Sequence, residues 1–162
     1  TYAITRGTNA FGSNQYPEKL VPIACKKLKN GEKVPLHGDG LQVRQWIHVD
    51  EFAEFMSMVG LGLISKDRRS VGQTYNIAGP VKVPVVSLVE KIAEYMGIEP
   101  DDAHERVPDR PGGDREYSVD GTKAYRKFGF QAKRRITDPV ELEKLVDSYS
   151  ADADYEVAIY GE

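Results

Sequence analysis

The chain has 162 residues, of which 40% are hydrophobic and 29% charged, as in an average globular protein. Its 22 Lys and Arg against 25 Asp and Glu give a net charge of -3, which argues against nucleic-acid binding driven by overall charge. No apolar run approaches the ~20 residues that a membrane span needs. We therefore expect a soluble protein with one domain over residues 1–150, and with neither nucleic acid nor a membrane as partner.

The cysteine and histidine residues follow no disulfide or metal-site pattern. Cys25 is the single cysteine, so it forms no internal disulfide, and its helical context favours a small core residue. His37, His48 and His104 are scattered without metal-ligand spacing. A reducing cytoplasm fits this composition, and no secretory signal pattern opens the chain. We expect a cytoplasmic location and no metal.

A strand over 2–6 and a helix from Pro17 are the first elements expected. Proline suits the first turn of a helix, Glu18 suits its positive dipole end, and the Asn-Gly pair at 30–31 can end it. The loop 7–14 is rich in residues that favour turns. Because the chain begins inside a strand, we expect that an upstream segment is missing.

Residues 35–50 are the most informative stretch. Its Gly-Asp-Gly turn at 38–40 tolerates positive φ angles, which let a backbone approach a ligand closely. In the strand that follows, Arg44, Trp46 and His48 alternate with residues that can pack inward, so one face carries a fixed guanidinium. Arginine can bind a phosphate with two hydrogen bonds. The pattern indicates a phosphate-holding turn, with a hairpin whose arginine is merely solvated as the alternative.

Strands and helices alternate through the rest of the chain. Asp50 is expected to cap a helix through Val59. Further strands are expected over 73–79 and 105–107, and further helices over 85–96, 120–128 and 137–146, the last two capped by Asp120 and Thr137. Asn76, polar in an apolar strand, should have a backbone or ligand partner. The acidic tail over 151–162 is expected to be loosely held, or to dock on a partner.

The loop 108–115 contains two prolines and two glycines, which fix an irregular path. Arg110 sits between rigid neighbours in this loop and is a second candidate phosphate ligand. Alternatively, it forms a surface ion pair with Asp109 or Asp114. Among the histidines, His37 is the one whose position beside the glycine turn favours a ligand contact.

Five linked motifs carry a resemblance to a known family. They are Thr5-Arg6 with Asn9; Tyr16-Pro17-Glu18-Lys19-Leu20-Val21-Pro22; Pro35-Leu36-His37-Gly38-Asp39-Gly40 with Gln42, Arg44, Trp46, Val49 and Asp50; Tyr75-Asn76-Ile77-Ala78-Gly79; and Asp109-Arg110-Pro111-Gly112 with Asp114, Arg115 and Tyr117. In order and spacing they resemble the nucleotide-sugar 4,6-dehydratases, and the dTDP-glucose 4,6-dehydratases in particular. These are extended short-chain dehydrogenases of the NAD-dependent epimerase/dehydratase family, and the resemblance runs to about residue 149.

The resemblance implies a set of residues that bind a dTDP-sugar or a UDP-sugar. They are Asn9, Glu18, Lys19, Leu20, Pro35, Leu36, His37, Arg44, Asn76, Asp109, Arg110 and Gly113. Two arginines from separate loops, Arg44 and Arg110, are expected to straddle the diphosphate. Such an anchor supplies binding energy away from the reacting carbons.

The implied fold is α/β, with short strands and about five helices, and corresponds to the C-terminal, substrate-binding half of the enzyme. The N-terminal Rossmann half is absent, because the Gly-Asp-Gly at 38–40 and the Gly-Leu-Gly at 60–62 lack the third glycine and the strand-to-helix setting. No Tyr-x-x-x-Lys pair occurs either. We therefore assign no catalytic residue to this chain, and its cofactor-binding residues stay unknown.

In the family's chemistry, NAD takes a hydride from C4 of glucose, water leaves across C5 and C6, and the hydride returns to C6. The product is a 4-keto-6-deoxy sugar nucleotide in carbohydrate biosynthesis, and the enzyme is a lyase. We expect this chain alone to have no turnover. Because its first strand has a free edge, we expect a homo-oligomer or association with the missing half.

Three departures from the family pattern leave other functions open. Ala10 stands where the family usually has Asn beside the nicotinamide cofactor, His37 where it has Tyr, and Gly113 where it has His. The first raises the alternative of a non-catalytic sugar-nucleotide-binding module. The other two bear on the base, and leave a UDP-sugar epimerase, decarboxylase or dehydratase as a further alternative.

Overall fold

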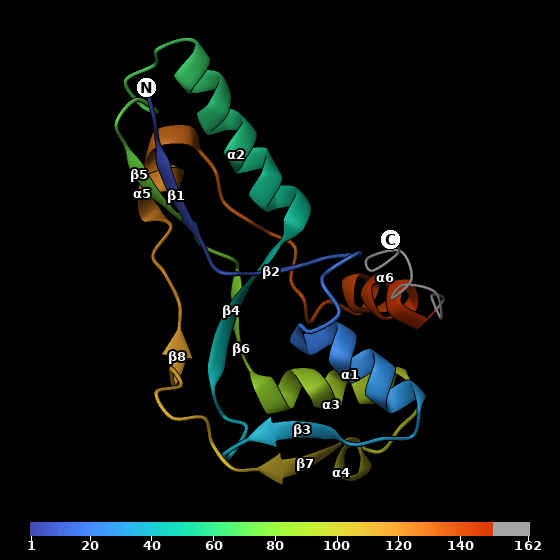
Figure 1. The fold of residues 1–162 in the computed structure, drawn as a ribbon. Helices are drawn as coiled ribbons and strands as arrows, with labels where there is room; N and C mark the ends of the chain where they lie inside the picture. Colours follow the sequence, from blue (N-terminus) through green and yellow to red (C-terminus); the bar gives the residue numbers. More distant parts are fainter. Residues whose placement is uncertain (151–162) are drawn as a thin grey trace, which may run out of the picture. The chain divides into compact units, whose positions relative to one another are not determined.

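The computed structural model describes residues 1–150, and the predicted acidic tail at 151–162 lies outside them. Eight short strands and six helices follow one another along this range (Figure 1). The elements are β1 Ile4–Gly7, β2 Asn9–Phe11, α1 Leu20–Lys29, β3 Val34–His37, β4 Val43–His48, α2 Val49–Ile64, β5 Thr74–Ile77, β6 Val81–Pro84, α3 Val85–Tyr95, α4 Pro100–Ala103, β7 His104–Val107, β8 Glu116–Tyr117, α5 Thr122–Phe128 and α6 Pro139–Ser150. The expected α/β class is confirmed, and the helix beyond the expected five is the single turn α4.

Contacts group the chain into two compact units, each built from three separate segments. Unit 1 contains residues 1–11, 43–83 and 116–136, and unit 2 contains residues 12–42, 84–115 and 137–162. Because both units are assembled from distant segments, neither is a continuous stretch of sequence. The assignment of one domain to residues 1–150 stays a prediction.

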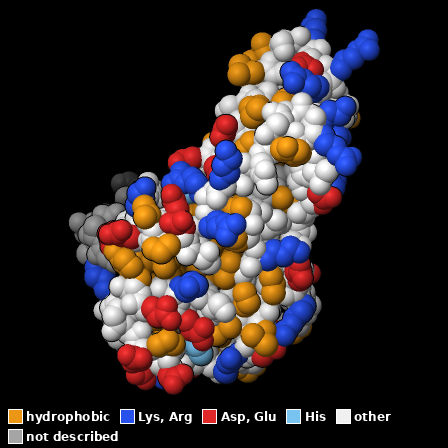
Figure 2. Space-filling view, turned by 180° about the vertical axis from the view of Figure 1, so that it is seen from behind, with side chains coloured by type: hydrophobic (Ala, Val, Ile, Leu, Met, Phe, Trp, Pro, Cys, Tyr) orange, Lys and Arg blue, Asp and Glu red, His pale blue; other side chains and the backbone are white. Residues whose placement is uncertain are grey.

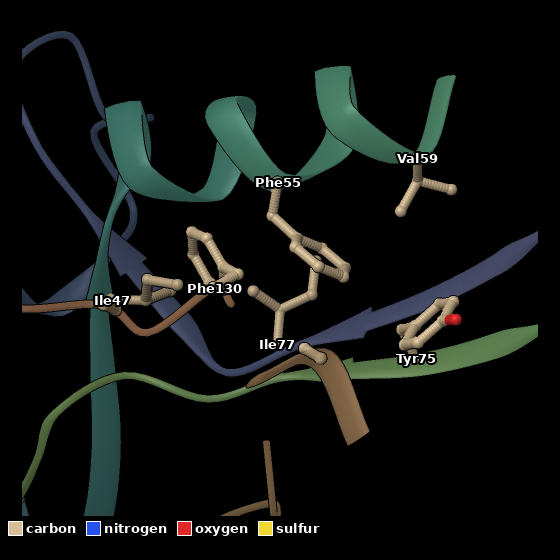
Figure 3. Close-up of a cluster of buried hydrophobic side chains, with 8 residues drawn as sticks. Ile47, Phe55, Val59, Tyr75, Ile77 and Phe130 are labelled. Carbon is tan, nitrogen blue, oxygen red and sulfur yellow. The ribbon is translucent and has the colours of Figure 1, made fainter. Parts of the chain in front are cut away.

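Unit 1 joins parallel strands to two helices. β1 pairs with β5, and β4 is hydrogen-bonded to β2, β6 and β8. The pairs β1–β5, β2–β4 and β4–β8 are all parallel. Helix α2 turns its buried residues Phe55, Val59 and Gly62 inward at helical spacing. Figure 3 shows Phe55 directed from α2 towards Ile77 of β5 and Phe130.

Aromatic side chains fill the core of unit 1. Phe55 lies 5.6 Å from Tyr75, 5.6 Å from Phe128 and 4.8 Å from Phe130, measured between ring centroids. The pairs with Tyr75 and Phe128 are edge-to-face and the pair with Phe130 is tilted, and such aromatic pairs stabilise a core by about 0.5–1.5 kcal/mol beyond the area they bury. The strands and α5 are thereby fixed beneath α2.

Four helices, α1, α3, α4 and α6, and one strand pair form unit 2 within the described residues. β3 and β7 run parallel, and α1 and α3 both pack against β3. Val21, Ala24 and Leu28 recur at helical spacing along the buried face of α1. Cys25, on the same helix, is 1% exposed, and its burial raises the thiol pKa to about 12. The expectation that Cys25 is a core residue is confirmed.

Several predicted element ends differ from those observed. Helix α1 begins at Leu20 rather than Pro17, because residues 17–19 form a turn before it. His48, not Asp50, is the N-cap of α2, where its Nδ1 accepts the backbone N–H of Asp50 at 3.1 Å. At α6 the N–H of Val140 is accepted by Asp138 at 3.1 Å, not by Thr137. For α2 and α6 the cap lies one or two residues from the predicted one, and α1 begins three residues after its predicted start.

Strand β4 does not have the exposed face that alternation predicts. Gln45, Trp46, Ile47 and His48 are all buried, because β4 has neighbours on both edges and elements on both faces. Arg44 alone of the predicted outward set is partly open to solvent. Strands enclosed in this way show continuous burial instead of alternation.

The surface carries both signs of charge. On the face in Figure 2, acidic and basic side chains are interspersed, with hydrophobic side chains visible between them. This mixture agrees with the small net charge of -3. Within residues 1–150, no helix combines the length and apolar composition that a membrane crossing requires.

Candidate functional site

The predicted glycine turn and the proline-rich loop meet in unit 2 because β3 and β7 pair. The register places Leu36 opposite Arg106 and His37 opposite Val107. One residue further, the N–H of Gly38 donates to the Val107 carbonyl at 2.9 Å. Since parallel strands end at the same edge, the segments that follow β3 and β7 begin side by side.

A hydrogen-bonded chain links these two segments. His37 Nδ1 lies 3.0 Å from the Pro108 carbonyl oxygen, and His37 Nε2 lies 2.9 Å from Nε of Arg110. A carbonyl oxygen only accepts and a guanidinium only donates. The contacts therefore assign the imidazole as neutral, with its proton on Nδ1 and its Nε2 accepting from Arg110.

Within residues 1–150, the Arg110 guanidinium forms neither of the two surface ion pairs that were the alternative prediction, with Asp109 or with Asp114. Its guanidinium contacts His37, while the Asp109 carboxylate accepts the backbone N–H of Arg110 at 2.8 Å. Gly113 closes the loop by donating its N–H to the Arg110 carbonyl at 3.1 Å. The alternative of an ion pair with Asp109 or Asp114 is thus not the contact observed among the described residues.

The glycine turn carries an ion pair to which sequence reasoning gave no role. Nη1 of Arg115 lies 2.6 Å from Oδ1 of Asp39, and the same oxygen accepts the Leu41 N–H at 2.9 Å. These hydrogen bonds, the one from Arg115 foremost, lower the pKa of Asp39 to about 2. The carboxylate stays ionised and paired. An aspartate between two glycines was the signal available in the sequence.

Glycine is required at both ends of this turn. Gly38 and Gly40 have φ angles of +59° and +68°, as predicted. A Cβ on Gly40 would also lie 3.0 Å from Nη1 of Arg106 and 3.1 Å from Cδ1 of Leu36. The turn is therefore fixed by backbone conformation and by close packing together.

Other predicted binding residues of unit 2 are less suited to a ligand contact. Leu36 is 1% exposed and belongs to the core, so its side chain cannot reach a ligand. Pro35, beside it on β3, is partly buried. Glu18 and Lys19 form an exposed ion pair at 3.4 Å in the turn before α1, and Leu20 is the first residue of that helix.

The remaining predicted residues lie in unit 1. Asn9 of β2 is opposite Trp46, and Asn76 of β5 is opposite Arg6, in the two parallel pairs. Nη1 of Arg44 donates to the Val43 carbonyl at 2.9 Å. Because Arg44 and Arg110 belong to different units, their joint binding of one diphosphate stays a prediction.

Two features of unit 1 were missed by sequence reasoning. Gln45, 7% exposed, donates to the Gly79 carbonyl at 2.7 Å and accepts the Val119 N–H at 2.9 Å. A polar residue in an otherwise buried strand was its sequence signal. The second is a pocket of about 360 Å³, lined by Ala78, Gly79, Pro80, Asp120, Gly121, Thr122, Ala124, Tyr125, Phe130, Gln131 and Ala132. Its walls come from separate loops and from helix α5, so no local motif predicts it.

Comparison with known proteins finds similarity to one protein family. Residues 1–78 match the family described as the NAD dependent epimerase/dehydratase family. This chain is similar to that family over these residues. It is 39% identical over 135 residues to a dTDP-glucose 4,6-dehydratase of Streptomyces griseus, covering 83% of this chain and 39% of the relative. It is 36% identical over 149 residues to the low-salt glycan biosynthesis protein Agl12 of Haloferax volcanii, covering 92% and 45%.

Solved structures give the same relationship. The dTDP-glucose 4,6-dehydratase of Bacillus anthracis in complex with NAD superposes with a TM-score of 0.79 at 33% identity, over 94% of this chain and 45% of that one. DesIV of Streptomyces venezuelae, a dTDP-glucose 4,6-dehydratase with NAD and TYD bound, gives 0.82 at 30% identity, over the same shares of 94% and 45%. The chain thus spans less than half the length of these relatives. The predicted resemblance to dTDP-glucose 4,6-dehydratases and NAD as the family's cofactor are confirmed, whereas the predicted correspondence to the C-terminal half of those enzymes is not supported by these matches.

The glycine patterns of this chain do not form a dinucleotide turn. Gly38 and Gly40 lie between strands β3 and β4, and Gly60 and Gly62 lie inside helix α2. A pyrophosphate cradle needs its glycines between a strand and the start of a helix. These residues therefore do not fit the NAD phosphates. Within residues 1–150, His, Cys, Asp and Glu side chains also do not gather in threes at a potential metal site.

Proposed function

We propose that this chain is the sugar-nucleotide-binding part of a nucleotide-sugar 4,6-dehydratase that acts on dTDP-glucose. The observation that carries the proposal is the junction of the 38–40 turn with the 108–115 loop through β3, β7 and the His37–Arg110 contact. Sequence reasoning assigned both segments to the nucleotide diphosphate independently. Their meeting in one place supports a common ligand.

The electrostatics of the junction suit a diphosphate. Arg110 uses only Nε on His37, which leaves its two terminal amino groups for a planar, two-point contact with phosphate oxygens. Asp39 would repel an anion, but its pairing with Arg115 at 2.6 Å neutralises that charge. The turn therefore presents backbone groups and cations to the ligand, without an unpaired carboxylate at Asp39.

We propose that the chain alone has no turnover. Its sequence contains no Tyr-x-x-x-Lys pair, and the described residues offer no fitting turn for the NAD phosphates. Activity would then require a polypeptide that supplies the dinucleotide-binding residues. Keto-sugar formation from NAD and dTDP-glucose by the pure chain would overturn this part of the proposal.

The test of binding is a two-dimensional amide NMR titration with dTDP-glucose, with UDP-glucose as the matched competitor. We expect the peaks of His37, Gly38 and Arg110 to shift at lower concentrations of the thymidine nucleotide. If the same peaks shift at equal or lower concentrations of UDP-glucose, the proposed substrate would be a UDP-sugar instead of a dTDP-sugar. Well-dispersed peaks that ignore both nucleotides would contradict binding by this chain alone.

A UDP-sugar function is the second candidate, because one relative supports it directly. A trifunctional enzyme of Arabidopsis thaliana whose name includes UDP-glucose 4,6-dehydratase is 34% identical over 126 residues. The same titration separates this candidate from the first.

A non-catalytic sugar-nucleotide module is the third candidate, and Ala10 on β2 favours it. It differs from the first in complementation: adding a dinucleotide-binding polypeptide of a relative would restore activity to a dehydratase part and not to a module. Binding without restored activity would favour the module.

A further inference from the structure

The position of His37 suggests a role beyond ligand contact. Its ring Nδ1 is hydrogen-bonded to the Pro108 carbonyl, and its Nε2 accepts a hydrogen bond from Nε of Arg110. Both nitrogens are therefore occupied by protein groups, and neither is free to bind a ligand. A residue in this arrangement can act only through the group that it holds.

We propose that His37 is a positioning residue, whose neutral Nδ1–H tautomer holds the Arg110 guanidinium through its Nε–H for an anionic ligand. The inference rests on the proposed function for the identity of that ligand. The contact itself is a property of the protein and does not depend on the ligand.

The geometry explains why the tautomer matters. The Pro108 carbonyl at 3.0 Å requires a proton on Nδ1, and the Arg110 Nε–H at 2.9 Å requires a lone pair on Nε2. A second proton on the ring would set an N–H against an N–H and a cation against a cation. The guanidinium would then swing away. Arg110 has no other side-chain partner among the described residues to hold it in place.

Charged groups on β7, on the following loop and on the glycine turn belong to the same part of unit 2 as His37. Arg106 belongs to β7, opposite β3, and Asp109 follows in the loop, where its carboxylate would lie 3.0–3.1 Å from a Cβ on Gly38. The Asp39–Arg115 pair lies on the glycine turn. Because Asp39 is already paired with Arg115, it is not available to stabilise an imidazolium. Asp109 is the remaining acid near the ring, and its substitution serves as a control.

The first test reads the tautomer directly, without ligand. The ¹⁵N shifts of the His37 ring in the whole chain should show the proton on Nδ1, and Nε of Arg110 should show a correlation to His37 Nε2. In His37→Phe that correlation should be absent. The guanidinium N–H signals of Arg110 should also average to one position, because the side chain then rotates freely. A proton on Nε2 in the unchanged chain would overturn the inference.

The second test measures binding of dTDP-glucose, whose diphosphate diester keeps its charge over the range in which histidine titrates, at about pH 8 and about pH 5.5. We expect the unchanged chain to bind more weakly, by roughly tenfold or more, at the lower pH, as for the loss of one hydrogen bond to a charged group. His37→Gln keeps an acceptor and should bind with little pH dependence. His37→Phe should bind weakly at both values. Asp109→Asn should retain the pH dependence.

The outcomes separate this inference from the proposed function. Failure of the unchanged chain to bind, with the Nδ1–H tautomer present, would overturn the sugar-nucleotide assignment and still support the positioning contact. Equal binding by His37→Phe and the unchanged chain at both pH values would overturn the positioning role and leave the sugar-nucleotide assignment standing.

Discussion

Gln45 shows how a single amide fixes the interior of unit 1. Its side chain joins three separate segments, because it extends from β4 to the Gly79 carbonyl and to the Val119 N–H. Both backbone groups would otherwise be buried without a partner. An unsatisfied buried polar group costs about 1–3 kcal/mol, so the amide is worth more to stability than a typical hydrogen bond.

Replacing Gln45 by Leu should lower the free energy of unfolding by about 2–4 kcal/mol, because two buried backbone groups lose their partners. Gln45→Glu should also destabilise, since a carboxylate can accept from Val119 but cannot donate to Gly79. Urea unfolding followed by circular dichroism would measure both. A Gln45→Leu chain as stable as the parent would show that solvent reaches these groups.

Two glycines of unit 1 offer a matched comparison. A Cβ on Gly79 would lie 1.6 Å from the Trp46 carbonyl oxygen, whereas a Cβ on Gly60 would meet nothing within 4 Å. Gly79→Ala should therefore prevent native packing, with a loss of about 3 kcal/mol or more. Gly60→Ala, inside α2, should stabilise by about 0.5–1 kcal/mol. Opposite signs in parallel urea titrations are expected, and equal effects would contradict the packing argument.

Asp39 should become protonated at a lower pH than an ordinary aspartate. Its pKa is lowered to about 2 by Arg115, so the stability that the ion pair contributes is present above the usual aspartate range and is lost as pH falls towards 2. The carboxyl ¹³C shift of Asp39 should follow this midpoint. Arg115→Ala should raise the pKa of Asp39, although the Leu41 N–H bond remains. An unchanged midpoint in Arg115→Ala would contradict the pairing.

At the scale of elements, strand β1 has one paired edge. It pairs with β5 on one side, and within residues 1–150 no strand pairs with its other edge. Tyr2 and Ile4, 64% and 44% exposed, lie at this strand. An unpaired edge with apolar side chains is a template for another chain. We therefore expect β1 to pair with a second copy of this chain or with a complementary polypeptide.

The unpaired edge of β1 predicts that the mass of the particle in solution rises with protein concentration. Light scattering after gel filtration should show self-association that rises with concentration, and Ile4→Lys should reduce it, because a charge on an edge strand opposes pairing. Leu61→Lys is the control, since Leu61 is 67% exposed on α2 and away from any strand edge. A monomer at every concentration would contradict self-association through β1.

Elements with a strong local signal could be predicted from the sequence, and their ends and surroundings could not. The Asn-Gly pair at 30–31 predicted the end of α1, whose C-cap is Asn30. Its start was misplaced because Pro17 and Glu18 suit a turn as well as a first helical turn. The burial of His48 was missed because it depends on Phe11, whose ring lies 5.0 Å away across β2 and β4.

At the scale of the whole molecule, the residues of the candidate site were predicted from the sequence, and the contacts between them were not. Gly38, Gly40 and Arg110 were chosen for their conformational freedom and charge, which are local properties. The contact between His37 and Arg110 depends on the β3–β7 pairing, which joins segments that are distant in sequence. Resemblance to a family supplied the residues. Only the fold could supply the imidazole between the two segments.

The chain has one tryptophan and one cysteine, and these fall in different units. Trp46, 3% exposed, is in unit 1, and Cys25, 1% exposed, is in unit 2. Tryptophan emission therefore reports the opening of unit 1, while the rate of thiol labelling reports the opening of unit 2, without any engineered label. Coincident transitions in denaturant would mean that the two units unfold as one cooperative body. Separate transitions would give each unit its own stability, and would identify which of them a bound nucleotide protects.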